Sequence, residues 1–92
     1  MNQEAEKKKF AKIFETTNGH QVLVYIEPDG GDYFLHQIAE CDGFQADLKV
    51  TFKSEDEDEN ERKAYAAFDA IDQAMAERLS DMVIKTIEEI NA

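Results

Sequence analysis

Acidic side chains crowd a short segment after the middle of the chain, and their spacing comes close to that of a metal-binding loop. Asp56, Asp58 and Asn60 match the opening D-x-D-x-N of a calcium-binding EF-hand loop. The loop needs glycine at its sixth position, which is Glu61, and a bidentate glutamate at its twelfth, which is Ala67. We therefore expect no calcium site here, and no other metal or cofactor.

The residues that could ligate zinc or act as nucleophiles are few and poorly spaced. His20 and His36 are too far apart in the sequence to form a zinc-ligand pair. Cys41 lies close to His36 in the sequence, but His20 has no such neighbour. Cys41 has no basic neighbour in the sequence to stabilise a thiolate, Ser54 is a candidate helix cap, and Ser80 lies among helix formers. We expect the protein not to be an enzyme.

Charge and composition narrow the classes of partner. The 92 residues carry a formal charge of −11, and the basic residues 7–9 are confined to one end. The negative electrostatic field of such a charge repels nucleic acid and anionic membranes, so we expect neither as a direct partner. No apolar run approaches the roughly 20 residues that span a bilayer, and a single cysteine fits a reducing compartment. We expect a soluble, cytoplasmic protein with one domain covering residues 1–92.

The elements that would position these side chains begin with a sheet in residues 10–53. Apolar and polar residues alternate from Phe44 to Phe52, which predicts a strand with one face buried. Further strands are predicted at 20–27 and 33–38, with turns at 28–32 and 41–43. Asn18-Gly19 favours a hairpin that would make 10–16 a fourth strand, although residues 4–12 also favour a helix.

The period of the apolar residues changes to that of a helix in residues 54–91. Ser54 with Glu57 resembles a capping box, and Asp56 is a competing N-cap. A single helix would be about 55 Å long, whereas an eight-residue strand reaches only about 26 Å. We therefore expect either a break between residues 73 and 81, with Ser80 or Asp72 as the second N-cap, or a long helix that buries its overhang in a homodimer.

These patterns together predict an α+β fold: an antiparallel three- or four-stranded meander followed by one long or two shorter C-terminal helices. The apolar stripe of the helical half contains Tyr65, Phe68, Ile71, Met75, Leu79, Met82, Val83, Ile87 and Ile90.

The charge predicts an interaction protein whose negative surface binds a basic, nucleic-acid-binding groove of a protein partner. Carboxylates three or four residues apart on a helix lie roughly 6 Å from each other, which is similar in scale to backbone phosphates. The residues predicted to contact the partner are Glu55, Asp56, Glu57, Asp58, Glu59, Glu61, Asp69, Asp72, Glu77 and Asp81.

In size, charge and order of elements, the chain resembles the small phage-encoded inhibitors, including anti-CRISPR proteins. The resemblance covers the whole chain and carries no diagnostic motif, so it assigns no individual residue. It implies that the protein is a nucleic-acid mimic that blocks a Cas nucleoprotein complex in the cytosol of the host cell.

A structural or assembly protein is the alternative interpretation. The C-terminal part of the stripe would then form a homodimer or dock on a larger assembly. The acidic residues would only maintain solubility.

Overall fold

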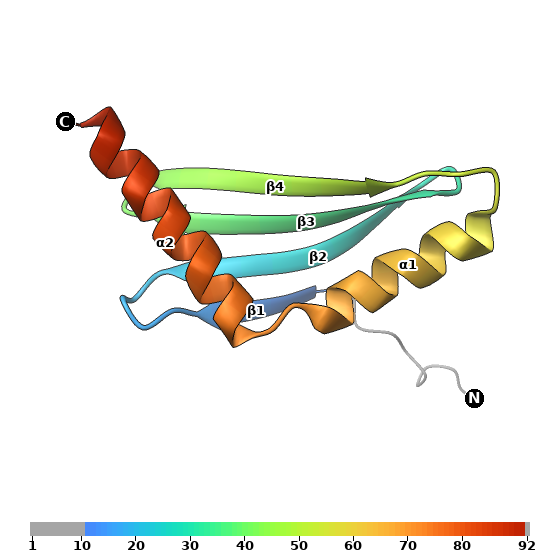
Figure 1. Cartoon of the computed structure of the whole chain (residues 1–92), viewed down its shortest axis with the longest axis horizontal. Helices are drawn as coiled ribbons and strands as arrows, with labels where there is room; N and C mark the ends of the chain where they lie inside the picture. The colour runs from blue at the N-terminus through green and yellow to red at the C-terminus, as the bar shows by residue number, and fades with distance from the viewer. Residues whose placement is uncertain (1–10, 92) are drawn as a thin grey trace.

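The chain folds into a four-stranded antiparallel sheet with two helices on one of its faces, as Figure 1 shows for the computed structural model. The structure describes residues 11–91. The strands are β1 (Ala11–Glu15), β2 (Gln21–Asp29), β3 (Asp32–Cys41) and β4 (Phe44–Phe52), and they lie side by side in sequence order. The helices are α1 (Glu57–Ala70) and α2 (Gln73–Ile90). The predicted α+β meander with C-terminal helices is confirmed, with four strands and two helices.

The first hairpin confirms that the segment before Asn18-Gly19 is a strand. Ala11 pairs with Tyr25 and Glu15 pairs with Gln21. Gly19 has a φ of +86°, which glycine adopts without the cost that a Cβ would add. Residues 1–10, which include the start of the predicted strand and most of the alternative helix, lie outside the described residues.

The turn between β2 and β3 is tighter than the sequence suggested. A turn was expected at 28–32, but only Gly30 and Gly31 lie between the two strands. Pro28 belongs to β2 and lies opposite Tyr33. A proline can occupy this place because, within residues 11–91, β1 pairs with β2 only as far as Tyr25, and no other strand of this range needs the missing N–H of Pro28.

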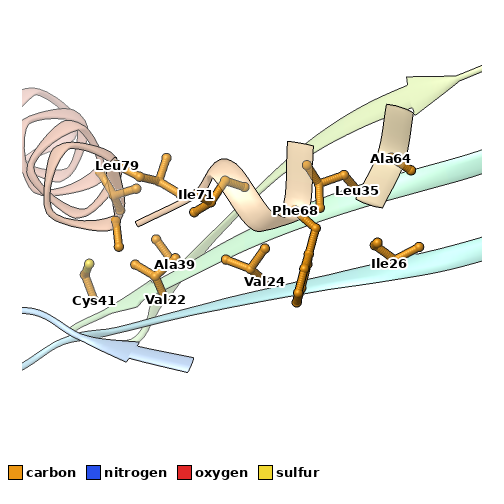
Figure 2. Close-up of a cluster of buried hydrophobic side chains, with 12 residues drawn as sticks. Val22, Val24, Ile26, Leu35, Ala39, Cys41, Ala64, Phe68, Ile71 and Leu79 are labelled. Atoms are coloured by element: carbon orange, nitrogen blue, oxygen red, sulfur yellow. The ribbon is translucent and has the colours of Figure 1, made fainter. Parts of the chain in front are cut away.

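The helices cover the sheet face formed by alternate residues of β2 and β3, and the core lies between these layers (Figure 2). Val22 and Val24 of β2 and Ala39 of β3 are fully buried, and Phe68 of α1 is 2% exposed. Further core residues are Ile26, Leu35, Cys41, Ala64, Ile71, Ala76, Leu79 and Val83. The apolar face of β2 therefore packs against the apolar stripe of the helices, as expected for a two-layer domain.

The expectation that β4 buries its apolar face is wrong for most of that strand. Phe44, Leu48 and Val50 are 41%, 48% and 38% exposed, although their side chains lie on the helix-covered face. In α2, Met82 and Ile90 of the predicted stripe are also exposed. The reason is geometric: α1 and α2 contact mainly β2 and β3, so the apolar side of the edge strand remains uncovered.

The two helices are separated at Ile71 and Asp72. Asp72 is the N-cap of α2, and its side chain accepts a hydrogen bond from the Met75 backbone N–H. The break therefore lies just before the expected interval of 73–81, with one of the two expected caps. Ser80 is not a cap, because it is fully buried inside α2 with its Oγ 3.8 Å from the Sγ of Cys41.

Candidate acidic interaction surface

The acidic segment begins α1, as its position before the apolar stripe suggested, but the cap differs from the capping box. Asp56 is the N-cap, and its Oδ1 accepts a hydrogen bond from the backbone N–H of Glu59 at 3.2 Å. Glu57, Asp58 and Glu59 form the first turn, where carboxylates are stabilised by the positive end of the helix dipole. Ser54 instead donates from its Oγ to the Oδ1 of Asn60 at 2.7 Å.

Asn60 fixes this helix start against the sheet. Its side chain is 2% exposed, and its Nδ2 donates to the carbonyl oxygen of Gly31 at 2.9 Å and to that of Ser54 at 3.2 Å. Gly31 has a φ of +95°, and a Cβ there would lie 2.8 Å from the side chain of Glu57. The glycine is therefore required both by the turn and by the close approach of α1.

This contact brings two acidic segments together at one end of the molecule, where the β2–β3 turn meets the start of α1 (Figure 1). Asp29 and Asp32 flank the turn and form the last residue pair of β2 and β3. We name the combined surface the acidic pole. It consists of Asp29, Asp32, Glu55, Asp56, Glu57, Asp58, Glu59 and Glu61.

Asp29 and Asp32 are not among the contact residues that the sequence pattern predicts. The antiparallel pairing of β3 and β4 indicates where they lie, because it places the last residue of β4, Phe52, beside Tyr33 near the start of β3. The segment that follows β4 must start next to the turn that precedes β3. An explicit meander topology would have placed both aspartates beside the acidic segment.

Not every carboxylate of the pole is equally available. Glu59 forms ion pairs with Arg62 and with Lys63. The hydrogen bond from Arg62 is the main cause that lowers the pKa of Glu59 below its ordinary value. Glu55, Glu57 and Asp58 are exposed, and residues 11–91 offer them no ion pair. These three side chains, together with the exposed Asp29 of the turn, are open to a partner.

The remaining predicted contact residues lie away from the pole and do not form one surface with it. Asp69 is exposed in the last turn of α1, Asp72 caps α2, and Asp81 is exposed in the middle of α2. Glu77 accepts hydrogen bonds from the backbone N–H of Thr17 at 3.1 Å and from the Nε2 of Gln73 at 2.9 Å. Asp72 and Glu77 thus have structural roles that connect α2 to its own start and to the β1–β2 turn.

The hydrogen bonds around Glu77 also affect its titration. The pKa of Glu77 is lowered below its ordinary value, first by the hydrogen bond from Gln73 and then by the backbone and side-chain donors of Thr17. The ionised form is therefore the one that holds the β1–β2 turn against α2.

His36 lies on the sheet face that the helices leave open, but it is far less accessible than a surface strand residue. It is 7% exposed and stacks on Tyr25 with ring centroids 4.5 Å apart. Its Nε2 lies 2.8 Å from the Oε1 of Glu27, and its Nδ1 lies 3.2 Å from the Oδ2 of Asp47. The imidazole therefore connects side chains of β2, β3 and β4.

Within the described chain, no group of three or more His, Cys, Asp or Glu side chains is arranged to hold a metal ion. Cys41 is 1% exposed. Over the same residues, neither helix has the length and apolar character needed to cross a membrane.

Comparison with known proteins gives no relative from which a role could be transferred. No protein-family model, no curated protein and no solved structure matches the chain.

Proposed function

We propose that this protein is a non-enzymatic interaction protein whose acidic pole binds a basic surface of a protein partner in the cytosol. The observation that carries the proposal is the convergence of the β2–β3 turn with the start of α1, fixed by the bond from Asn60 to Gly31. It gathers carboxylates from two segments that are distant in the sequence onto one rigid end.

Rigidity matters because ordered charges bind with a smaller entropic cost than charges on a mobile tail. Asp56 is held as a helix cap, and Asn60 is buried beneath the pole. The exposed Glu55, Glu57 and Asp58 then present a fixed pattern of negative charge. A groove that normally binds phosphates is the complementary surface, so the proposed action is competition with nucleic acid for that groove.

The test compares two variants with the same loss of charge. In the pole variant, Glu55→Gln, Glu57→Gln and Asp58→Asn neutralise three open carboxylates of the pole. In the control variant, Asp81→Asn, Glu88→Gln and Glu89→Gln neutralise three exposed carboxylates of α2. Circular dichroism establishes that both variants are folded before binding is compared.

Each variant is used to capture partners from cell lysate at increasing salt, and the captured protein is then challenged with duplex DNA or RNA. The proposal expects the pole variant to lose the partner, the control variant to retain it, and wild-type binding to weaken with salt and with added nucleic acid. Equal loss in both variants would show that net charge, not the pole, is responsible. Binding that is insensitive to salt would contradict the proposal altogether.

A further inference from the structure

The β4 strand is an exposed edge of the sheet with an apolar groove along it. The strand order β1-β2-β3-β4 leaves β4 without a second neighbour among residues 11–91. A groove of about 360 Å³ follows this edge and lies between β4 and α2. The groove is lined on the β4 side by Phe44, Ala46 and Leu48, and on the α2 side by Met82, Ile87 and Ile90, among others.

The groove includes the outer edge of β4 as well as its apolar face. Gln45 and Asp47 also line it, although their side chains lie on the opposite face of the sheet. The C-terminal end of α2 projects past β4 in Figure 1, so this helix overhangs the edge. The space beneath the overhang therefore has the position of an additional strand of the sheet.

The β3–β4 turn determines which backbone groups face that space. Asp42 and Gly43 form a two-residue turn with φ values of +50° and +85°, so the flanking pair Cys41 and Phe44 is hydrogen-bonded across the hairpin. Hydrogen-bonded and non-hydrogen-bonded pairs alternate along an antiparallel ladder. The backbone N–H and C=O groups that point away from β3 are consequently those of Gln45, Asp47, Lys49 and Thr51.

We propose that a second copy of this chain occupies the edge, with its own β4 antiparallel to the first and a twofold axis at Leu48. In this register, the whole of β4, from Phe44 to Phe52, is paired with β4 of the second copy. Asp47 lies opposite Lys49 of the second copy, and Lys49 lies opposite Asp47 of the second copy. Phe44 lies opposite Phe52 on the helix-covered face.

Charge selects this register over its neighbours. Side chains must remain on their own face, so the axis must lie at a residue and not between two residues, and the two nearest alternatives place it at Asp47 or at Lys49. An axis at Asp47 would place Asp47 opposite Asp47 of the second copy. An axis at Lys49 would place Lys49 opposite Lys49 of the second copy. Like charges directly opposite each other are destabilising, whereas opposite charges stabilise a cross-strand pair. The axis at Leu48 gives two opposite-charge pairs and uses the whole strand.

The same register gives the exposed apolar side chains a partner. Leu48 would contact Leu48 of the second copy at a non-hydrogen-bonded position, where side chains approach most closely. Val50 would lie opposite Ala46 of the second copy. The exposed faces of Phe44, Leu48 and Val50, which the fold of one chain leaves uncovered, would thus be buried together. This inference is independent of the acidic pole.

The decisive experiment exchanges the charges of the cross-strand pair. Asp47→Lys alone places lysines opposite each other, and Lys49→Asp alone places aspartates opposite each other, so each single variant should be monomeric. The two variants mixed together should form a heterodimer, because one chain then has only lysines at these positions and the other only aspartates. The double variant Asp47→Lys/Lys49→Asp should form a homodimer again.

The oligomeric state is measured by light scattering after size exclusion and by analytical ultracentrifugation. Moderate salt is used so that repulsion between two chains of net charge −11 is screened. Wild type is expected at twice the 10.5 kDa chain mass. Asp47 also lies 3.2 Å from the Nδ1 of His36, so thermal unfolding of each variant is recorded to separate loss of pairing from loss of fold.

A second pair of variants avoids that contact. Leu48→Glu changes a side chain that is 48% exposed and should weaken self-association roughly a hundredfold, because two carboxylates would face each other at the axis. Ile13→Glu makes the same change at a residue that is 62% exposed on β1, at the opposite edge, and should leave the dimer intact. A wild-type protein that is monomeric at high micromolar concentration, or a dimer that Leu48→Glu leaves unchanged, would overturn the proposal.

Discussion

The Nζ of Lys12 lies 2.6 Å from the carbonyl oxygen of Phe68, and this contact connects the first strand to the end of the first helix. The same Nζ donates to the carbonyl oxygen of Ile71 at 2.9 Å and lies 4.4 Å from the centre of the Phe68 ring. The last carbonyl groups of a helix lack the N–H partner four residues further on, and that of Phe68 accepts a backbone hydrogen bond from Ile71 at 3.3 Å. Lys12 adds a charged donor from across the domain, at the place where α1 ends and the chain turns into α2.

Replacement of Lys12 by methionine should therefore destabilise the fold. The side chain keeps its length, but the two carbonyl groups lose a charged donor, and hydrogen bonds to charged groups contribute about 1.5–3 kcal/mol. The free energy of unfolding from urea titration checks this value. Lys85→Met, at an exposed position of α2, is the matched control and should change it by less than about 0.5 kcal/mol.

Asn60→Ala should destabilise the protein by about 1–3 kcal/mol, because it removes a buried amide together with its hydrogen bonds to Gly31 and Ser54. The carbonyl oxygen of Gly31 would lose its 2.9 Å donor, and the Oγ of Ser54 would lose its acceptor. The control is Asn91→Ala at the exposed C-terminal end of α2, which should be close to neutral. If Asn60→Ala unfolds at the same urea concentration as wild type, this amide does not hold the helix start against the sheet.

Asp72→Ala should cost about 0.5–2 kcal/mol through loss of the α2 N-cap. Asp72→Asn should recover most of this, since an asparagine side chain can also accept the bond from the Met75 N–H. Asp69→Ala removes an equal charge three residues earlier, in the last turn of α1, where an acid opposes the helix dipole. It should be neutral or slightly stabilising, so a loss of similar size in Asp69→Ala and Asp72→Ala would contradict the capping role.

Glu77 predicts a pH dependence whose sign follows from its lowered pKa. A carboxyl group with a lower pKa in the folded state stabilises the fold above the pKa it has when unfolded, ordinarily about 4.5. That contribution disappears as pH falls through the folded-state value. Glu77→Gln should therefore be less stable than wild type at neutral pH, and the difference should diminish toward pH 3.

Unfolding free energies at several pH values measure this difference. Glu88→Gln, at an exposed residue near the end of α2, is the control. A difference between wild type and Glu77→Gln that stays constant from pH 7 to pH 3 would show that the bonds from Thr17 and Gln73 do not depend on ionisation.

Local signals in the sequence predicted the elements well where local chemistry decides them. The Asn18-Gly19 hairpin, the alternation from Phe44 to Phe52 and the Asp56 cap depend on residues close together in the chain. The capping role expected of Ser54 was wrong because its hydroxyl donates a hydrogen bond to the side chain of Asn60 instead. Asn60 in turn donates to the carbonyl oxygen of Gly31, which is distant in the sequence.

The order of the residues is enough to set the strand and helix periods, the acidic character, and the need for the helical half either to break or to pack against a second chain. The packing of the elements in three dimensions sets the break at Asp72, brings the β2–β3 turn against the acidic segment, and leaves the apolar face of β4 exposed. The physical reason is that periodicity states which side of an element is apolar, whereas the position of the helices over the sheet decides which apolar side is covered.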